Sequence, residues 1–164
     1  MGVLEVDVIK SFARSADLGN SVWYMGHLLT FLATGEDTNW HFTLIEARAV
    51  RGGEPPPHIH HLEDELYFVL EGEVTFFVGE ETYEAGPGST VFLPRGVPHW
   101  FTLNSETART LILLTPAGLE GYFRALAEPA RALTLPPPPE KPYDLAEVAT
   151  VAERYGVQFL AGGR

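Results

Sequence analysis

The sequence contains no cysteine among its 164 residues. Disulfide-stabilised scaffolds, cysteine-ligated zinc or iron–sulfur sites and cysteine nucleophiles are therefore excluded. Positive charge is also scarce, because 11 basic residues stand against 22 acidic ones and the formal net charge is −11. Proteins that bind nucleic acids or anionic membranes need clustered Lys and Arg, so neither partner is expected. The six histidines are the most informative titratable residues that remain.

Long hydrophobic runs and targeting signals are missing as well. No segment approaches the roughly 18 apolar residues of a membrane-spanning helix. Residues 1–7 carry acids where a signal peptide would carry basic residues. We therefore expect a cytoplasmic protein. The length suits one domain, and the apolar share of 45% is sufficient for a hydrophobic core.

The middle of the chain, from about residue 26 to residue 115, predicts many short strands separated by Gly- and Pro-containing turns. The segments between the turns are rich in β-branched and aromatic residues, which favour strands. The predicted strands include residues 42–45, 66–70, 74–78, 90–93 and 110–114. Regularly spaced short strands of this kind are typical of an antiparallel sandwich or barrel.

The C-terminal part of the chain changes to a helical pattern. Residues 117–127 carry apolar side chains at helical spacing, and residues 144–155 form a second predicted helix with Asp144 as its N-cap. The apolar stripe of the second helix consists of Leu145, Val148, Val151, Ala152 and Tyr155. Four prolines at 136–139 predict a stiff spacer between the helices. We expect both helices to pack outside the β core or on a partner subunit.

One short stretch concentrates side chains that bind metals. His58 and His60 lie two residues apart, so in a strand they point to the same face. Glu65 begins the next predicted strand, and His99 follows a tight turn at residues 94–98. Three imidazoles and one carboxylate suit a divalent transition metal such as Fe, Mn, Co, Ni, Cu or Zn. Four protein ligands leave coordination positions open for water, O2 or substrate, as in catalytic sites.

The spacing of these residues resembles the two motifs of the cupin superfamily. The first motif is Gly, five residues, His-x-His, three or four residues, Glu, six residues and Gly, and it matches Gly52, His58, His60, Glu65 and Gly72. The second motif is Gly, five residues, Pro-x-Gly-x-x-His, three residues and Asn, and it matches Gly88, Pro94, Gly96 and His99. Leu103 stands where the second motif has Asn, and Asn104 follows one place later.

The resemblance implies an all-β fold, a cupin jelly-roll β-barrel with short C-terminal helices. The barrel with its metal site would span residues 40–116. Residues 1–39 would form an N-terminal segment with edge strands, and residues 117–164 a helical appendage with the proline spacer. The implied metal ligands are His58, His60, Glu65 and His99.

Several other polar residues near the motifs have simpler interpretations. His61 follows a ligand directly, so strand alternation turns it away from the site. His27 and His41 are isolated, and we expect each to be hydrogen-bonded or solvent-exposed. Glu63 and Asp64 are expected to be solvated.

Strand alternation also predicts the lining of the barrel. If Glu65 and His99 point inward, Tyr67 and Phe101 do so too, and Phe76 faces the same interior. We interpret Tyr67, Phe76 and Phe101 as substrate-binding residues. An apolar, aromatic lining suits a small flat ligand better than a sugar phosphate, which would require Arg or Lys.

Among cupins, the chain is similar to bacterial single-domain quercetin 2,3-dioxygenase-like proteins, on the segment from Pro55 to Glu71 and on the helical tail. This resemblance implies a dioxygenase with a flavonol substrate and O2. In such enzymes the metal binds the deprotonated flavonol, oxygen adds, the heterocycle opens and carbon monoxide leaves. Glu65 would bind the metal and also act as the base for the substrate hydroxyl.

Two other functions remain open at this point. One is a non-catalytic, metal-bound module that binds a small apolar molecule. The other is a metal-assisted isomerase or decarboxylase, which would need an inward Arg for the substrate carboxylate. Arg48, Arg95 and Arg109 are the candidates, with Arg95 expected at the rim. Since an open sheet edge invites pairing, we expect a homodimer.

Overall fold

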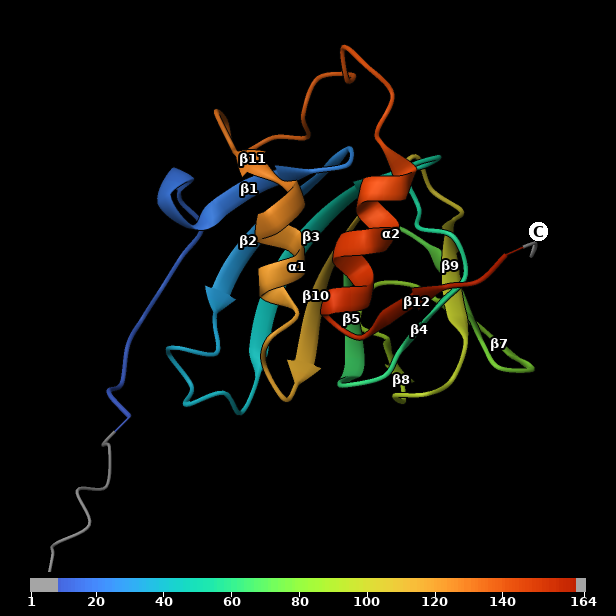
Figure 1. The fold of residues 1–164 in the computed structure, drawn as a ribbon, viewed down its shortest axis with the longest axis horizontal. Coiled ribbons are helices and arrows are strands. Elements are labelled where there is room, and N and C mark those ends of the chain that lie inside the picture. The colour runs from blue at the N-terminus through green and yellow to red at the C-terminus, as the bar shows by residue number, and fades with distance from the viewer. Residues whose placement is uncertain (1–8, 162–164) are drawn as a thin grey trace, which may run out of the picture.

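The computed structural model describes residues 9–161, which form two antiparallel β-sheets and two short helices (Figure 1). The strands are β1 (Ser21–Tyr24), β2 (His27–Ala33), β3 (Thr43–Val50), β4 (His58–His60), β5 (Asp64–Glu71), β6 (Val74–Val78), β7 (Glu81–Ala85), β8 (Thr90–Leu93), β9 (His99–Leu103), β10 (Thr107–Thr115), β11 (Glu128–Pro129) and β12 (Val157–Phe159). The helices are α1 (Glu120–Leu126) and α2 (Leu145–Arg154), and a 3-10 turn (Leu18–Asn20) precedes β1. The predicted strands and both predicted helices are confirmed.

The order of the strands is that of a jelly roll. The larger sheet runs β11-β1-β2-β3-β10-β5-β8, and the smaller runs β12-β4-β9-β6-β7. Neighbours such as β3 and β10 are far apart in sequence, because the chain crosses repeatedly from one sheet to the other. The predicted all-β jelly-roll class is confirmed.

The core lies between the two sheets and follows from strand alternation. In β3, β5 and β10, every second side chain is buried. Ile45, Val69 and Leu114 are fully buried in this way, with exposed fractions of 0%. The intervening side chains face outward, among them Arg48 and Arg109, which are paired in register. The interior is therefore apolar except where a polar residue occupies an inward position.

Gly72, the last glycine of the first motif, closes the turn between β5 and β6. Its φ of +88° lies in the left-handed region, where a side chain is strained. A Cβ atom at this position would also lie 2.5 Å from the carbonyl oxygen of Thr107. Only glycine fits this backbone conformation and this close approach.

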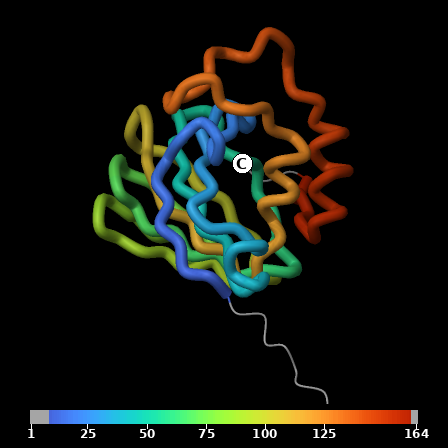
Figure 2. The backbone as a smooth tube through the Cα atoms, turned by 90° about the vertical axis from the view of Figure 1, so that its left-hand side faces the viewer, coloured from blue at the N-terminus to red at the C-terminus, as the bar shows by residue number. Residues whose placement is uncertain are grey.

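The two helices cover one side of the barrel. Figure 1 shows α1 and α2 side by side in front of the larger sheet, and Figure 2 shows both on the same side of the molecule. Asp144 caps α2 by accepting hydrogen bonds from the backbone N–H groups of Ala146 and Glu147, at 3.0 and 3.1 Å. Val148 and Ala152 are buried against the core, as their place in the predicted stripe requires. Leu145, however, is 70% exposed, because it lies in the first turn of α2 and its neighbourhood opens to solvent.

A buried carboxylate attaches α1 to the larger sheet. Glu120 is 4% exposed and accepts hydrogen bonds from the backbone of Gly35 and Gly118 and from Thr43 Oγ1. Burial disfavours the charged carboxylate, but these donors outweigh it and leave the pKa of Glu120 below its usual value. The start of α1 is thereby held to the loop after β2 and to β3.

The segments before and after the predicted barrel contribute strands to the same sheets. β1 and β2 join the larger sheet beside β3, β11 pairs with β1, and β12 pairs with β4. The division at residues 39 and 116 stays a prediction. Neither helix within residues 9–161 has the length and hydrophobicity needed to cross a membrane.

Candidate metal site

The four predicted ligands come together between the two sheets. His58 and His60 belong to β4, and His99 begins the neighbouring strand β9, where it pairs in register with His58. Glu65 reaches the same point from β5 in the opposite sheet. All four residues are buried, and one ligand atom from each lies within 4.8 Å of the others. The cluster therefore brings together residues 41 positions apart in sequence, from His58 to His99.

Local geometry positions each ligand strand. His58 and His60 share a face because β4 is extended, while Ile59 between them points to the other side. Gly96 adopts a φ of +78° in the turn before β9, and its N–H donates to the carbonyl of His60 at 2.8 Å. This hydrogen bond ties the turn that precedes His99 to the strand that carries the other two imidazoles.

The hydrogen bonds of the three imidazoles define which ring nitrogen faces the centre. Nδ1 of His58 lies 2.8 Å from the Pro56 carbonyl, and Nδ1 of His99 lies 3.0 Å from the Val97 carbonyl. Nδ1 of His60 lies 2.5 Å from a carboxylate oxygen of Glu63. Each of these partners accepts hydrogen bonds, so Nδ1 carries the ring proton. In the neutral ring Nε2 then has a free lone pair. These lone pairs can bind a cation.

The inward atoms lack partners of their own. Nε2 of His99 and Oε2 of Glu65 lie 3.0 Å apart, and Nε2 of His60 lies 3.4 Å from the same oxygen. Neither His99 Nε2 nor Glu65 Oε2 forms a properly oriented hydrogen bond within residues 9–161, although both are fully buried. Buried polar atoms without partners are costly, and a divalent cation would satisfy them together. The residues therefore fit a metal bound by three nitrogens and one oxygen.

The pKa values of the cluster follow from its burial and its mutual charges. Burial alone would raise the pKa of Glu65, but His60, His99 and His58 outweigh it and lower the pKa to about 2. Burial lowers the pKa of His58 to about 4, with the neighbouring His99 and His60 adding to the effect. For His60 burial acts in the same direction, but Glu65 and Glu63 overcome it and raise the pKa. The carboxylate of Glu65 is thus kept ionised.

Glu63 was expected to be solvated, and this expectation is wrong. Its side chain is 3% exposed and holds His60 through the 2.5 Å hydrogen bond. The turn between β4 and β5 folds the carboxylate back toward the strand, which strand alternation alone does not predict. A carboxylate three residues after a predicted histidine ligand was the available signal, because ligand histidines commonly donate their second N–H to such a group.

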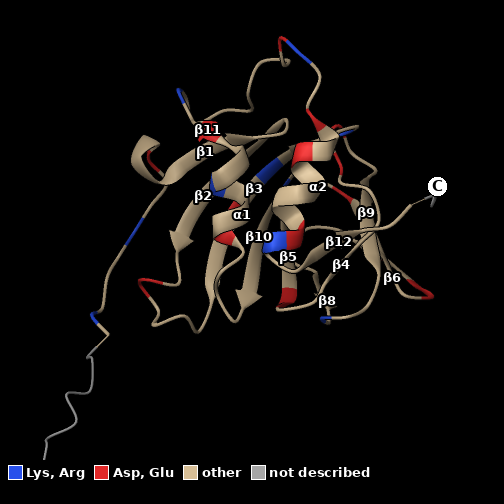
Figure 3. Cartoon of the chain, in the orientation of Figure 1, with Lys and Arg blue, Asp and Glu red and all other residues tan. Residues whose placement is uncertain are grey.

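A cavity of about 420 Å³ adjoins the cluster. Its wall includes His58, His60 and Glu65 on one side and side chains of β2, β3, β6, β9 and β10 on the others. None of the residues that line it is Lys or Arg. Figure 3 shows no large cluster of basic residues on the drawn part of the chain. Cavities of this size and apolar character typically bind small organic molecules.

The three residues expected to bind substrate form an aromatic group in this cavity. Tyr67, Phe76 and Phe101 all line it. The ring centroids of Tyr67 lie 5.1 Å from Phe76 and 5.9 Å from Phe101, and those of Phe76 and Phe101 lie 5.7 Å apart. Burial, and then the charge of Glu65, raise the pKa of Tyr67 well above its usual value, so its hydroxyl stays protonated.

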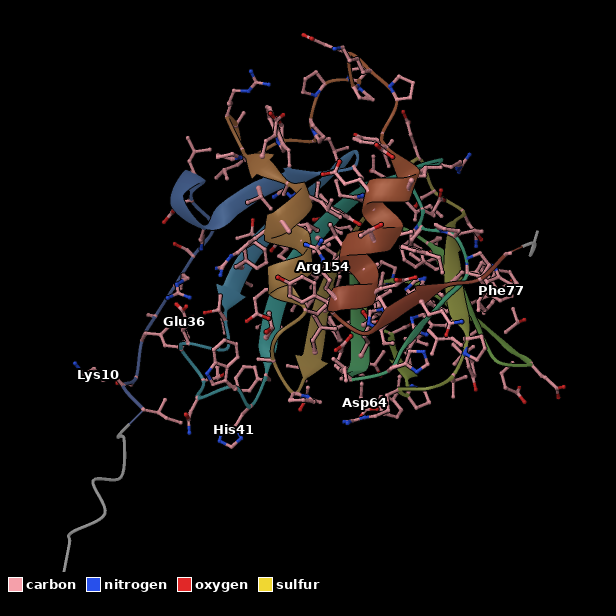
Figure 4. The ribbon with its side chains drawn as sticks, viewed as in Figure 1. Lys10, Glu36, His41, Asp64, Phe77 and Arg154 are labelled. Carbon is pink, nitrogen blue, oxygen red and sulfur yellow. The ribbon has the colours of Figure 1, made fainter. Side chains whose placement is uncertain are left out.

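Other candidates lie away from the cavity. His61 is exposed and its Nε2 lies 3.0 Å from Gln158, and His41 points outward in a loop at the edge of the molecule (Figure 4). Arg95 is exposed at the rim, where it pairs with Asp64 at 2.9 Å. Arg109 pairs with Glu46 and Glu71 on the outer face of the sheet, beside Arg48. None of the three arginines supplies the inward guanidinium that a carboxylate substrate would need.

The C-terminal helices also contribute to the cavity, which the sequence did not indicate. Tyr122 and Phe123 of α1 and Val148 and Ala149 of α2 line it. Leu145 lines it too while being largely exposed, so the cavity opens toward solvent near the start of α2. The helices do pack outside the barrel as expected, but they also form part of the cavity wall.

The fold is a jelly-roll β-barrel, and the four clustered residues give it a candidate metal site. A family model described as a cupin domain matches residues 47–133, more than half of the chain. The chain belongs to the cupin family.

One curated relative is a quercetin 2,3-dioxygenase of Bacillus subtilis, which is 24% identical over 109 residues. The alignment covers 66% of this chain and 32% of that protein. This chain spans about a third to about half of the length of the curated relatives that it matches. The resemblance to quercetin dioxygenase is therefore a resemblance to part of that enzyme.

Solved structures support the fold. An RmlC-like cupin from Shewanella frigidimarina has a TM-score of 0.57 and 18% identity, over 70% of this chain and 99% of that one. The nucleoside dehydratase Pac13 of Streptomyces has a TM-score of 0.54 and 16% identity, over 80% of this chain and 100% of that one. At such identities the likeness concerns the fold alone.

Proposed function

We propose that the protein is a metal-dependent dioxygenase that acts on a small, flat aromatic substrate of the flavonol type. One observation carries the proposal: three members of the cluster, His58, His60 and Glu65, line an apolar, aromatic cavity without Lys or Arg. Such a cavity favours neutral aromatic molecules over phosphates and carboxylates. The partial resemblance to a quercetin 2,3-dioxygenase supports the same reaction class.

In this proposal the three imidazoles and Glu65 hold a divalent transition metal through Nε2 atoms and a carboxylate oxygen. When bound, such a metal supplies positive charge and open coordination positions for a substrate oxygen. Glu65 would also accept the proton of the substrate hydroxyl, through the carboxylate oxygen that does not bind the metal. Its burial next to the cavity places it within reach of a bound ligand.

The aromatic group orients the substrate. Tyr67, Phe76 and Phe101 present ring faces and edges to the cavity, against which planar rings can stack. The surrounding apolar side chains exclude water from the reacting end. With no inward Arg from β3 or β10, the arrangement gives no support to an isomerase or decarboxylase of small acids.

The test combines metal analysis with oxygen consumption. We expect the purified protein to hold about one transition-metal ion per chain, and to consume oxygen and release carbon monoxide with quercetin. Glu65→Gln should abolish turnover, whereas the exposed Glu81→Gln serves as the matched control. Stoichiometric metal without oxygen uptake on quercetin or on a panel of catechols would refute the dioxygenase proposal and favour a non-catalytic binding module.

A further inference from the structure

The cavity contains a second group of polar side chains, away from the metal cluster and close to the β1–β2 turn. His27, the first residue of β2, is 8% exposed and lines the cavity. Tyr24 and Tyr122 line it as well, with their hydroxyl oxygens 2.6 Å apart. The rings of Tyr24 and His27 are stacked at 6.4 Å. Three polar side chains from two strands and a helix thus meet in an otherwise apolar wall.

His27 offers a hydrogen-bond acceptor to the cavity. Its Nδ1 lies 3.2 Å from the carbonyl oxygen of Tyr24, so Nδ1 donates and Nε2 of the neutral ring keeps a lone pair. Burial lowers the pKa of His27, which keeps the ring neutral. The backbone of Met25 also lies within hydrogen-bonding reach of the ring, and like the Tyr24 carbonyl it counters part of the effect of burial on the pKa of His27. Because His27 lines the cavity, its ring presents a polar edge in an otherwise apolar wall.

The tyrosine pair offers a donor. One hydroxyl donates its proton to the other, so the second hydroxyl keeps a proton that it can donate elsewhere. Burial raises the pKa of Tyr24 and of Tyr122, and both remain protonated. An acceptor and a donor in the wall of the same cavity suit a hydroxyl group, because a hydroxyl both donates and accepts.

The strand geometry places this group at a distance from the metal cluster. His99 and Leu103 are four residues apart in β9, which corresponds to about 13 Å. Glu54 accepts a hydrogen bond from the Leu103 N–H at 2.8 Å. Gly53, which directly precedes Glu54, packs on the His27 ring. A Cβ atom added to Gly53 would lie 3.5 Å from Cε1 of His27. His27 therefore belongs to the Leu103 end of the cavity, and His99 to the other.

The charge of the cavity restricts what can lie between the two ends. Its only ionisable acids are Glu54 and Glu65, and it has no cationic side chain. A ligand that carries a carboxylate or a phosphate at the His27 end would find no counter-charge.

We propose that His27 and the Tyr24–Tyr122 hydroxyl pair form a second recognition site, which binds a phenolic hydroxyl at the far end of an elongated neutral ligand. The inference rests on the proposed function in so far as the other end of that ligand binds at the metal cluster. It names the feature that the flavonol must carry, a hydroxyl on the ring remote from the metal-binding oxygens.

The experiment compares two flavonols that differ only in that feature. Quercetin carries two hydroxyls on its second ring, and galangin is identical except that this ring bears none. Binding is measured by titration calorimetry under nitrogen with the protein as purified. We expect the wild type to bind quercetin about tenfold more tightly than galangin, since a lost hydrogen bond leaves a buried group unpaired. His27→Phe should abolish the difference, because it should weaken the binding of quercetin and change the affinity for galangin by no more than about twofold.

Matched controls make the outcomes distinct. His41→Phe makes the same substitution at an exposed histidine outside the cavity and should retain the tenfold preference. Tyr122→Phe removes one hydroxyl with little change in shape and should reduce the preference, which keeps the test decisive if His27→Phe fails to fold. Three outcomes would overturn the second site. The wild type could bind both flavonols with equal affinity, the variants could lose affinity for both equally, or the wild type could bind neither.

The oxygen-uptake assay separates this result from that of the proposed function. If the wild type prefers quercetin, His27→Phe loses the preference, and no oxygen uptake occurs, the second site is supported and the dioxygenase proposal is refuted. If the wild type consumes oxygen with quercetin but binds quercetin and galangin equally well, the dioxygenase proposal is supported and the second site is refuted.

Discussion

The two walls of the cavity differ in their chemistry. The barrel wall carries the carboxylates and imidazoles, namely Glu54, His27 and three members of the cluster, His58, His60 and Glu65. The wall formed by α1, its N-cap Leu119 and α2 is apolar except for the hydroxyl of Tyr122. Both walls are required to enclose the cavity, but only the barrel wall can hold a metal. Under the proposed function, the barrel would determine the reaction and the helices would determine which molecules reach it.

The largest effect is expected from removing a ligand from the barrel wall. His58→Ala takes away one of three imidazoles and should lower metal affinity more than a hundredfold, since a vacated coordination position is filled only by water. Metal content after dialysis against a weak chelator, measured by mass spectrometry, checks this. His61→Ala removes an exposed neighbouring histidine and should retain the metal. Normal metal binding by His58→Ala would show that the ligand assignment is wrong.

Filling the helical wall should separate ligand binding from metal binding. Ala149 lines the cavity from α2, so Ala149→Phe should occupy part of its volume. We expect quercetin affinity to fall about thirtyfold, with metal content unchanged. Ala146→Phe introduces the same side chain on the exposed face of α2 and should leave affinity unchanged. Loss of metal from Ala149→Phe would contradict the independence of the two walls.

Glu63 tests whether the barrel wall depends on support from outside the ligand set. Glu63→Gln weakens the hydrogen bond that holds His60 and removes a negative charge near the site, so metal affinity should fall about tenfold. Competition with a chromogenic chelator measures the change. Asp64→Asn, which alters an adjacent acid paired with Arg95, is the control. An unchanged affinity in Glu63→Gln would show that the hydrogen bond only contributes to packing.

The smallest effect concerns the attachment of the helical wall to the barrel. Glu120→Gln replaces an acceptor of three hydrogen bonds by an amide and should lower the free energy of unfolding by about 1–2 kcal/mol at pH 7.

The pH dependence of this loss has a definite sign. Because the folded state lowers the pKa of Glu120, its stabilisation is fully present above the ordinary glutamate pKa of about 4.5 and disappears as the pH falls through the lowered folded value. Urea denaturation of both proteins at pH 7 and at successively lower pH should therefore show the difference shrinking. A difference that grows on acidification would contradict the assignment.

Most of the fold could be predicted because each prediction depended on local rules. Strand alternation determined which residues of β3, β5 and β10 face inward, and Asp144 marked the start of α2. The same alternation identified Tyr67, Phe76 and Phe101 as interior residues before their neighbours were known. The prediction for Leu145, as part of the apolar stripe of the second helix, did not hold for burial. Helical spacing does not indicate whether the first turn of a helix is covered by other parts of the protein.

Long-range packing decides the surroundings of the two side chains that local patterns describe least. Glu63 was misjudged because it lies in a turn, where no periodicity indicates direction, and its burial depends on β4 and β5 belonging to opposite sheets. His27 is hydrogen-bonded, as expected, but its place in the cavity wall depends on the approach of Gly53 and Tyr122 from elsewhere in the chain. Neither the burial of Glu63 nor the surroundings of His27 produce a pattern in the neighbouring sequence.

By itself the sequence determined the set of possible ligands. With no cysteine, the site had to consist of nitrogen and oxygen donors. The two-residue spacing of His58 and His60, together with the resemblance to the cupin motifs, made His58, His60, Glu65 and His99 the predicted ligands. Only the tertiary structure decided that these atoms converge from opposite sheets, that Glu63 holds His60 from behind, and that the helices close the cavity. The physical reason is that alternation along a strand is a local property, whereas a cavity exists only after separate elements have packed around it.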